Sequence, residues 1–378
     1  MNVETLVRCC FEAWRSARAT GTVPTTVALL GAPGIGKTSA ARLLAQRMTD
    51  HMRAQGVARD AVCEVRDLSS CLPEDLGGLP YREGGVTRYA PQAWMERLTA
   101  PDAYGVLVLD DLPAASSAVQ VASRQISLEH RVHDSVIAPG VMVIVTGNRR
   151  EDKSAAATLP AHFRNSVLLL PVEPDFRGWA TWYADQGLDP LIPRFLTFRT
   201  GHFSQLPKDA DGHGAFATPR TWAMFARLLP VARTTDTVWE VAAGLVGEGV
   251  ATEFVAFQRV VEELVSADRV LDDPKGALPD PVAVLATPDR MIAMVCALAD
   301  TTIARAKGAR DNRHHERYLR ALAWVTEKGG REFVAASVSA FIQGRGNFQK
   351  LEAAVRTCKD EPDVKGMLSA LAACFEGA

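Results

Sequence analysis

The chain of 378 residues is long enough for two or three domains with a sizeable core. Hydrophobic residues make up 47% and charged residues 23%, which is the composition of an ordinary globular protein. A formal net charge of −2 without a long run of like charges excludes a broad basic surface for nucleic acid, but not a local patch. The apolar runs fall far short of the roughly 20 residues of a membrane span, and no signal-peptide core is visible, so we expect a cytoplasmic protein.

Helical and strand-like segments alternate along the first half of the chain. Apolar residues at helical spacing over residues 2–19 predict an N-terminal helix, which ends at Thr22-Val23-Pro24. Near-continuous apolar runs separated by helical segments then predict a parallel α/β sheet that is covered on both faces. The strand candidates are Val27–Leu30, Ala61–Val65, Val106–Leu109, Val141–Val145 and Val167–Leu170.

The sequence also predicts a hairpin within the sheet region and several helices beyond it. In the irregular stretch 68–100, Glu83-Gly84-Gly85 lies between Tyr- and Arg-containing runs and predicts a hairpin turn. The helical segments after Pro174 are Phe176–Gln186, Leu191–Thr200, Arg220–Leu229 and Trp239 to about Val265, with a break at 272–281. We therefore expect an N-terminal helix (1–24), an α/β nucleotide-binding core (25–172), a helical lid (173–271) and a helical C-terminal region (272–378).

The segment GAPGIGKT, from Gly31 to Thr38, matches the P-loop pattern and lies between a predicted strand and a predicted helix. Glycines let backbone N–H groups surround phosphate oxygens, and a helix N-terminus favours negative charge. We expect Lys37 to reach the β- and γ-phosphates of ATP and the Thr38 hydroxyl to ligate Mg²⁺. The other candidates for phosphate binding are Gly31, Pro33, Gly34, Ile35, Gly36 and Ser39.

Two carboxylates follow the predicted strand Val106–Leu109, and an amide follows Val141–Val145. A buried strand that ends in acidic residues needs a cation nearby, so we expect Asp110 to hold Mg²⁺, directly or through water. Asp111 would polarise the attacking water, and Asn148 would orient that water or contact the γ-phosphate. The alternatives are an acidic pair that caps the next helix and an asparagine that only forms a turn.

In this order the motifs resemble those of the AAA+ ATPases and, over roughly residues 25–225, those of the MoxR family. The resemblance also rests on Pro73-Glu74-Asp75-Leu76-Gly77-Gly78 and on the segments Val119–Ala122 and Ser127–Val132. It implies a five-stranded sheet in the order 5-1-4-3-2, a helical lid and a ring, usually hexameric, that binds Mg-ATP. It further implies that Arg164, in LPAHFRN, is an arginine finger for the neighbouring subunit, and that Arg220, in ATPRTW, is the sensor 2 residue.

Asp111 departs from the family, where the second Walker B carboxylate is usually glutamate. The aspartate is one methylene shorter, and a displacement of about 1 Å can cost on the order of 10²-fold in rate. Slow hydrolysis, a compensating backbone shift and a ring that mainly binds ATP all remain open. We favour a working but slow ATPase.

The resemblance implies a MoxR-like ATPase that remodels or activates a protein partner, commonly one with a von Willebrand A domain. The alternatives are a nucleic-acid-directed motor or loader, an ATP-gated scaffold and, least favoured, a small-molecule kinase. The hairpin from Tyr81 to Tyr89 is a candidate for gripping a polypeptide, or a solvated hairpin without that role. His130 and His133 are expected to be exposed on a second hairpin, and the seven cysteines to be reduced, buried thiols.

Overall fold

The computed structural model describes residues 1–149, 161–206, 214–327, 333–334, 338, 341 and 345–376. The chain divides into two compact units, which are described separately. The first unit comprises Met1–Asp175, Leu206–His213 and Thr218–Arg220, and the second comprises the remainder. The finer division into four parts stays a prediction.

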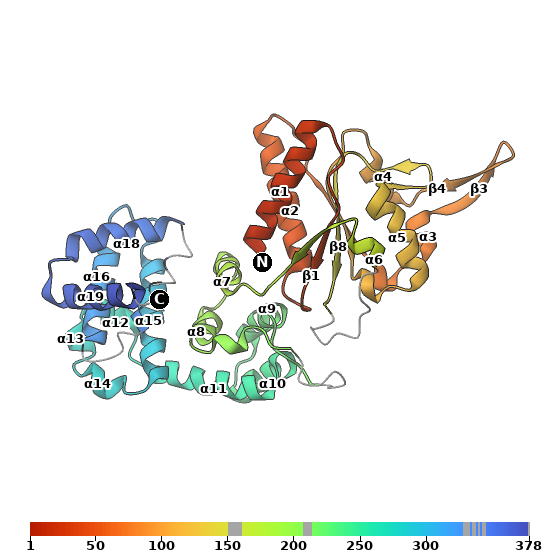
Figure 1. Ribbon diagram of the computed structural model, residues 1–378. Coiled ribbons are helices and arrows are strands. Elements are labelled where there is room, and N and C mark those ends of the chain that lie inside the picture. Colours follow the sequence, from red (N-terminus) through yellow and green to blue (C-terminus); the bar gives the residue numbers. More distant parts are fainter. Residues whose placement is uncertain are drawn as a thin grey trace. The chain divides into compact units, whose positions relative to one another are not determined.

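The first unit is built on a five-stranded parallel sheet (Figure 1). Its strands are β1 (Val27–Leu30), β2 (Val62–Asp67), β5 (Tyr104–Asp110), β8 (Gly140–Gly147) and β9 (Leu168–Pro171). They lie in the order β2-β5-β8-β1-β9. When only these five strands are numbered, that order reads 2-3-4-1-5, which confirms the predicted order 5-1-4-3-2 and the AAA+ fold class.

Helices cover both faces of this sheet (Figure 1). They are α1 (Val3–Thr20), α2 (Lys37–Ala54), α3 (Pro73–Gly77), α4 (Ala93–Thr99), α5 (Ser117–Glu129) and α6 (Ala161–Arg164). Successive side chains of a strand point to opposite faces. Val106 and Val108 of β5 accordingly pack with residues of α1 and α2, whereas Leu107 and Leu109 pack with residues of α4 and α5. Because both faces are buried, the strands are continuous apolar runs in the sequence.

Helix α1 is part of the core of the first unit. Its buried face carries Leu6, Val7, Cys10, Phe11, Trp14 and Ala17. The Trp14 indole N–H donates a hydrogen bond of 2.8 Å to the carbonyl oxygen of Gly140, at the start of β8. The helix predicted over residues 2–19 is therefore confirmed, and its apolar spacing is explained by packing against α2 and the sheet.

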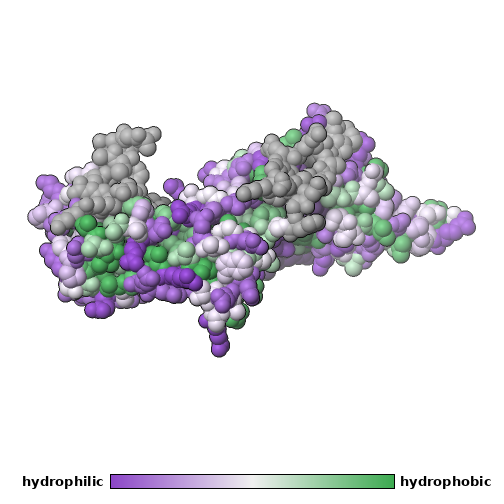
Figure 2. Space-filling model, turned by 90° about the horizontal axis from the view of Figure 1, so that it is seen from below, coloured by the Kyte–Doolittle hydropathy of each residue, from purple (hydrophilic) through white to green (hydrophobic). Residues whose placement is uncertain are grey.

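A β-hairpin of β3 (Leu79–Glu83) and β4 (Val86–Ala90) projects from the first unit, at the right of Figure 1. Gly84 and Gly85 have φ values of 58° and 83°, which confirms the predicted turn. Every residue of both strands is exposed. Figure 2 shows the same projection at its right edge, with hydrophilic atoms at the tip.

A second, shorter hairpin of β6 (Arg131–Val132) and β7 (Ser135–Val136) follows α5. The prediction that His130 is exposed is wrong, because its side chain is only 7% exposed. His130 adopts a left-handed backbone conformation at the end of α5 and turns its ring to within 3.4 Å of the Thr26 hydroxyl. Burial lowers the pKa of His130 to about 4. His133 is half-buried and stacks on Tyr89 with a distance of 3.7 Å between ring centroids.

The second unit is helical. Its principal helices are α7 (Phe176–Asp185), α8 (Leu191–Phe198), α9 (Pro219–Leu228), α10 (Thr235–Val246), α11 (Glu248–Glu263), α12 (Ala267–Asp272), α15 (Pro288–Arg305), α16 (Arg313–Thr326), α18 (Arg345–Cys358) and α19 (Pro362–Glu376), with the short α13 (Pro274–Ala277) and α14 (Pro281–Val284). A continuous helix from Trp239 to Val265 was expected, and this is wrong. Gly247, with a φ of 94°, separates α10 from α11, and a Cβ at this position would lie 2.8 Å from the Ala215 oxygen.

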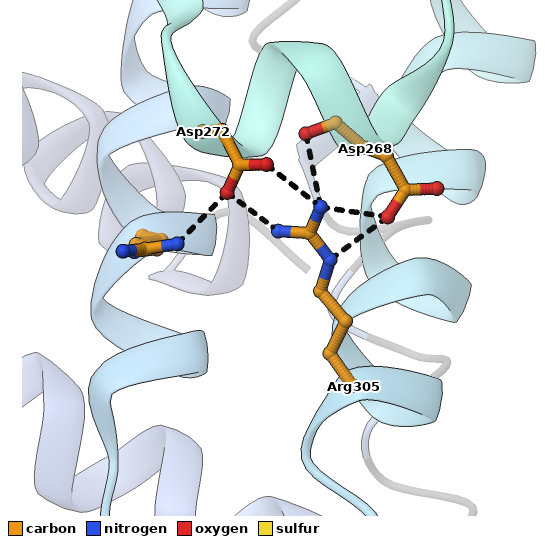
Figure 3. A network of polar contacts seen from close by, with 4 residues as sticks. Asp268, Asp272 and Arg305 are labelled. Atoms are coloured by element: carbon orange, nitrogen blue, oxygen red, sulfur yellow. Dashed lines mark hydrogen bonds and ion pairs between the residues drawn. The ribbon is translucent and has the colours of Figure 1, made fainter.

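An ion-pair network joins α12 to α15 and α16 in this unit (Figure 3). The Arg305 guanidinium donates to Asp268 Oδ1 at 2.8 Å and to both carboxylate oxygens of Asp272 at 2.8 and 3.0 Å. Arg317 donates to Asp272 at 2.8 Å. These hydrogen bonds lower the pKa of the Asp272 carboxyl.

Two further expectations concern the cysteines and the shortness of the apolar runs. The six cysteines whose side chains the structure describes form no disulfide, but only Cys10, Cys296 and Cys358 are buried, whereas Cys9 and Cys63 are exposed and Cys71 is half-buried. The expectation of buried thiols is thus confirmed for half of them. Within the ranges that the structure covers, no helix is both long and apolar enough for a membrane crossing.

Candidate nucleotide-binding site

The P-loop connects β1 to α2 at the carboxyl edge of the sheet. Gly34 and Gly36 have φ values of 76° and 100°, a region that side chains with a Cβ rarely adopt. Gly36 precedes α2 and provides no side-chain cap for the first turn of that helix. A Cβ on Gly31 would lie 2.5 Å from the Val172 oxygen, so only glycine fits beside the chain that leaves β9. The loop therefore presents backbone N–H groups at a helix N-terminus, as phosphate binding requires.

Lys37 folds back over this loop. Its ammonium group donates hydrogen bonds to the Gly31 oxygen at 2.7 Å, to the Ala32 oxygen at 2.9 Å and to Asn148 Oδ1 at 2.8 Å. Asn148 directly follows β8, next to β1 in the sheet. The structure thus brings together a lysine and an amide that lie 111 residues apart in the sequence.

Thr38 and Asp110 form the second pair of contacts. The Thr38 hydroxyl lies 3.2 and 3.1 Å from the two carboxylate oxygens of Asp110, the last residue of β5. Asp67 lies beside Asp110, because β2 extends two residues beyond the predicted strand and pairs Asp67 with Asp110. A hydroxyl and a carboxylate in contact are hard oxygen donors of the kind that Mg²⁺ prefers.

Asp111 has a left-handed backbone conformation, with φ of 57° and ψ of 41°. Burial raises the pKa of its carboxyl, Lys37 lowers it, and the charges of Asp110 and Asp67 raise it further. Its side chain makes no capping hydrogen bond to the 3₁₀ turn that follows, Leu112–Ala114, which removes the capping alternative for this residue. The backbone N–H of Asp111 instead donates to the Thr146 hydroxyl at 3.0 Å.

The two predicted arginines differ in their surroundings. Arg220 lies at the first turn of α9, in the short segment that belongs to the first unit, and its backbone N–H donates to the Gly34 oxygen at 3.1 Å. Arg164 ends α6 and is exposed. Leu159 and Pro160 of the LPAHFRN motif lie outside the described residues. Among the loop candidates, Ser39 is exposed, whereas Ile35 is 4% exposed and contributes its side chain to the core.

Thr146 and Asp67 were missed in the sequence. Thr146 interrupts the apolar run of β8 with a hydroxyl two residues before Asn148, and that polar break was the available signal. Asp67 was missed because the edge strand β2 is only partly buried, so its apolar run stops before the strand does. Gly147, between Thr146 and Asn148, leaves room for Pro113, because a Cβ there would lie 2.7 Å from the Pro113 ring.

No protein-family model matches the chain, and a search of curated proteins finds no match. Among solved structures, the chain is similar to the Thermotoga maritima RuvB Holliday junction branch migration motor, with 13% identity and a TM-score of 0.37 over 73% of this chain and 80% of that one. It is also similar to the Aeropyrum pernix ORC1 protein in complex with DNA, with 15% identity and a TM-score of 0.37 over 96% of this chain and 94% of that one. At these values neither similarity supports a conclusion about function.

Proposed function

We propose that this protein is an AAA+ ATPase that binds Mg-ATP at the P-loop and hydrolyses it. The observation that carries this proposal is the convergence of four side chains at one edge of the sheet. Lys37 contacts Asn148, and Thr38 contacts Asp110, so that a cation for phosphate, an amide and the oxygen donors for a metal lie together. The uncapped N-terminus of α2 and the left-handed glycines complete a cradle for phosphate groups.

Each residue has a distinct task in this proposal. Lys37 would exchange its carbonyl partners for the β- and γ-phosphates, and Asn148 would orient the attacking water. Thr38 and Asp110 would hold Mg²⁺, which supplies charge neutralisation on the phosphate oxygens. Asp111 would accept a hydrogen bond from the attacking water. A raised pKa makes its carboxylate a better proton acceptor than an ordinary aspartate.

The resemblance to MoxR proteins extends the proposal to an assembly and a partner. In a ring, which the resemblance implies to be hexameric, exposed Arg164 would reach the γ-phosphate bound by the neighbouring subunit. Arg220 would report the nucleotide to the helices that follow it. ATP turnover would remodel or activate a protein partner, for which a von Willebrand A-domain protein is the first candidate.

The test is steady-state ATP turnover across protein concentration, for the wild type beside Lys37→Ala and Arg164→Ala. Turnover that rises with assembly and collapses in both variants is the expected result. ATP binding and oligomerisation without turnover would contradict the ATPase and favour the ATP-gated scaffold. Salt-sensitive stimulation by DNA would favour a nucleic-acid-directed motor over a protein remodeller.

A further inference from the structure

We infer that Thr146 is a positioning residue that fixes both acidic residues at the end of β5. It would hold Asp110 by donating a hydrogen bond to it and Asp111 by accepting one from it. The inference rests on the proposed function, because it concerns the same ATP and Mg²⁺ site. It assigns a role to a residue outside the P-loop, the acidic pair and Asn148.

The contacts of Thr146 satisfy its hydroxyl in both directions. The Thr146 hydroxyl donates a hydrogen bond to Asp110 Oδ1, and Thr146 Oγ1 accepts one of 3.0 Å from the backbone N–H of Asp111. A hydroxyl has one hydrogen and two lone pairs, so the two bonds form together. Thr146 is 1% exposed, and water therefore does not compete for either bond. One side chain thus links two consecutive residues that have different tasks.

The sheet register places Thr146 opposite these residues. Leu109 of β5 pairs with Val145 of β8, and the next residues are Asp110 on β5 and Thr146 on β8. The side chains before Thr146 on β8 are all apolar, from Val141 to Val145. Packing alone would be satisfied by valine, which has nearly the same shape as threonine. The hydroxyl therefore serves the polar contacts.

Two consequences follow for the site. Asp110 receives hydrogen bonds from both Thr38 and Thr146, so its carboxylate is held from the P-loop and from β8. Asp111 keeps a left-handed conformation that non-glycine residues rarely adopt, and its N–H is satisfied only while the Thr146 hydroxyl is present among the contacts that the structure describes. Removing the hydroxyl should loosen both carboxylates at once, with little change in packing.

The test compares Thr146→Val, which removes the hydroxyl, with Thr146→Ser, which keeps it. Thr49→Val is the matched control, because Thr49 is also buried in the first unit and its hydroxyl also accepts a backbone N–H, from Ala61 at 2.9 Å. The first readout is amide hydrogen exchange at Asp111 without nucleotide or metal. The second is the Mg²⁺ concentration for half-maximal binding of a fluorescent ATP analogue, together with kcat and KM for ATP.

Thr146→Val is expected to lose protection of the Asp111 amide and to need on the order of 10- to 100-fold more Mg²⁺, as variants of outer-shell metal partners do. Its kcat should fall more than its KM rises, and Thr146→Ser should restore all three properties. If Thr146→Val keeps the wild-type exchange rate of the Asp111 amide and the wild-type Mg²⁺ dependence, this inference is wrong and the proposed function is unaffected. If Thr49→Val shows the same shift, the shift is a general effect of destabilisation, and the inference is also wrong. A wild type that binds no ATP analogue would overturn the proposed function, and the metal role of Thr146 with it.

Discussion

Asp111 combines a short side chain with an unusual backbone. Its left-handed conformation redirects the chain directly after β5, and the Thr146 hydroxyl holds the backbone N–H in place. Of the three explanations that the sequence leaves open for this aspartate, a backbone adjustment is the one with a visible structural counterpart. A conformation of this kind costs a non-glycine residue roughly 1–3 kcal/mol, and such strain clusters at functional sites.

Asp111→Glu separates reach from backbone geometry. If the short side chain limits turnover, the longer glutamate should raise kcat, by up to about 10²-fold for a gain of about 1 Å. The measurement is kcat per subunit at saturating ATP, with Asp111→Asn as the control that removes the charge. A glutamate variant that is no faster than the wild type would show that the backbone already compensates for the missing methylene.

At the scale of the element, the P-loop depends on a close approach that only glycine allows. Gly34 has a φ of 76°, and a Cβ there would lie 2.7 Å from the Thr218 hydroxyl oxygen and 3.3 Å from the Cβ of Arg220. Gly34→Ala is expected to weaken ATP binding, because the loop or the segment from Thr218 to Arg220 must shift. Isothermal titration with ATP and Mg²⁺ measures this loss.

Gly21→Ala is the matched control for that prediction. Gly21 ends α1 with a φ of 68°, but a Cβ there meets no atom within 4 Å. Gly21→Ala should therefore lower the free energy of unfolding by roughly 1–2 kcal/mol, the cost of a left-handed backbone for a residue with a Cβ, and leave ATP affinity unchanged. Equal effects of the two variants on ATP affinity would mean that the close approach at Gly34 does not shape the site.

The β3–β4 hairpin is exposed along both strands, and it packs on the rest of the first unit through the stacking of Tyr89 on His133. Every residue of its strands is exposed, including Tyr81 and Arg82 of β3. The double variant Tyr81→Ala, Arg82→Ala should keep basal ATP turnover and lose the stimulation of turnover by a protein partner. Unchanged stimulation would mean that the hairpin does not contact the partner. Substitution of the exposed Val121 on α5 by alanine serves as the surface control.

The Arg305 network predicts how the stability of the second unit depends on pH. The folded pKa of Asp272 lies below the ordinary value of 3.8, so its interactions stabilise the fold above that pH and are lost as the pH falls through the lowered pKa. Asp272→Asn should unfold at a lower temperature at pH 7. The loss in free energy of unfolding should be about 1 kcal/mol or less, because the Asp272 side chain is 53% exposed.

Thermal melts from pH 7 down to pH 3 measure this difference. The difference between the wild type and Asp272→Asn should narrow as the pH falls below 3.8, and high salt at pH 7 should also reduce it. A constant difference across that range would show that Asp272 stabilises the unit by packing and not by charge.

How much of these elements the sequence could predict depends on the signal that each carries. The buried strands were found because both faces of the sheet are covered, and continuous apolar runs follow from that. The break at Gly247 was missed, because several glycines occur there and only the contact with Ala215 shows which one ends a helix. His130 was misjudged, because a left-handed turn after α5, invisible in the apolar pattern, directs its ring inward. The role of Thr146 could not be predicted, because it depends on the register that places β8 beside β5.

At the scale of the whole molecule, the predicted ring can be tested by complementation. A Lys37→Ala subunit lacks a working P-loop but keeps Arg164, and an Arg164→Ala subunit has the reverse defect. If the finger acts in trans, mixing the two inactive variants should restore part of the turnover, because some interfaces then combine an intact P-loop with an intact arginine. Two copies of the same variant, mixed at equal total concentration, provide the control. No recovery on mixing would place Arg164 outside the neighbouring site.

The bond between Trp14 and Gly140 has a consequence for biosynthesis. The two residues lie 126 positions apart, so the part of the apolar face of α1 that packs on β8 leaves the ribosome long before that strand exists. At 5–20 residues per second this interval lasts roughly 6 to 25 s. During that time the face that carries Leu6, Phe11 and Trp14 is available to chaperones that bind nascent chains. A premature stop before β8 would leave part of this face permanently without its partner strand, and such fragments are expected to aggregate or to be degraded.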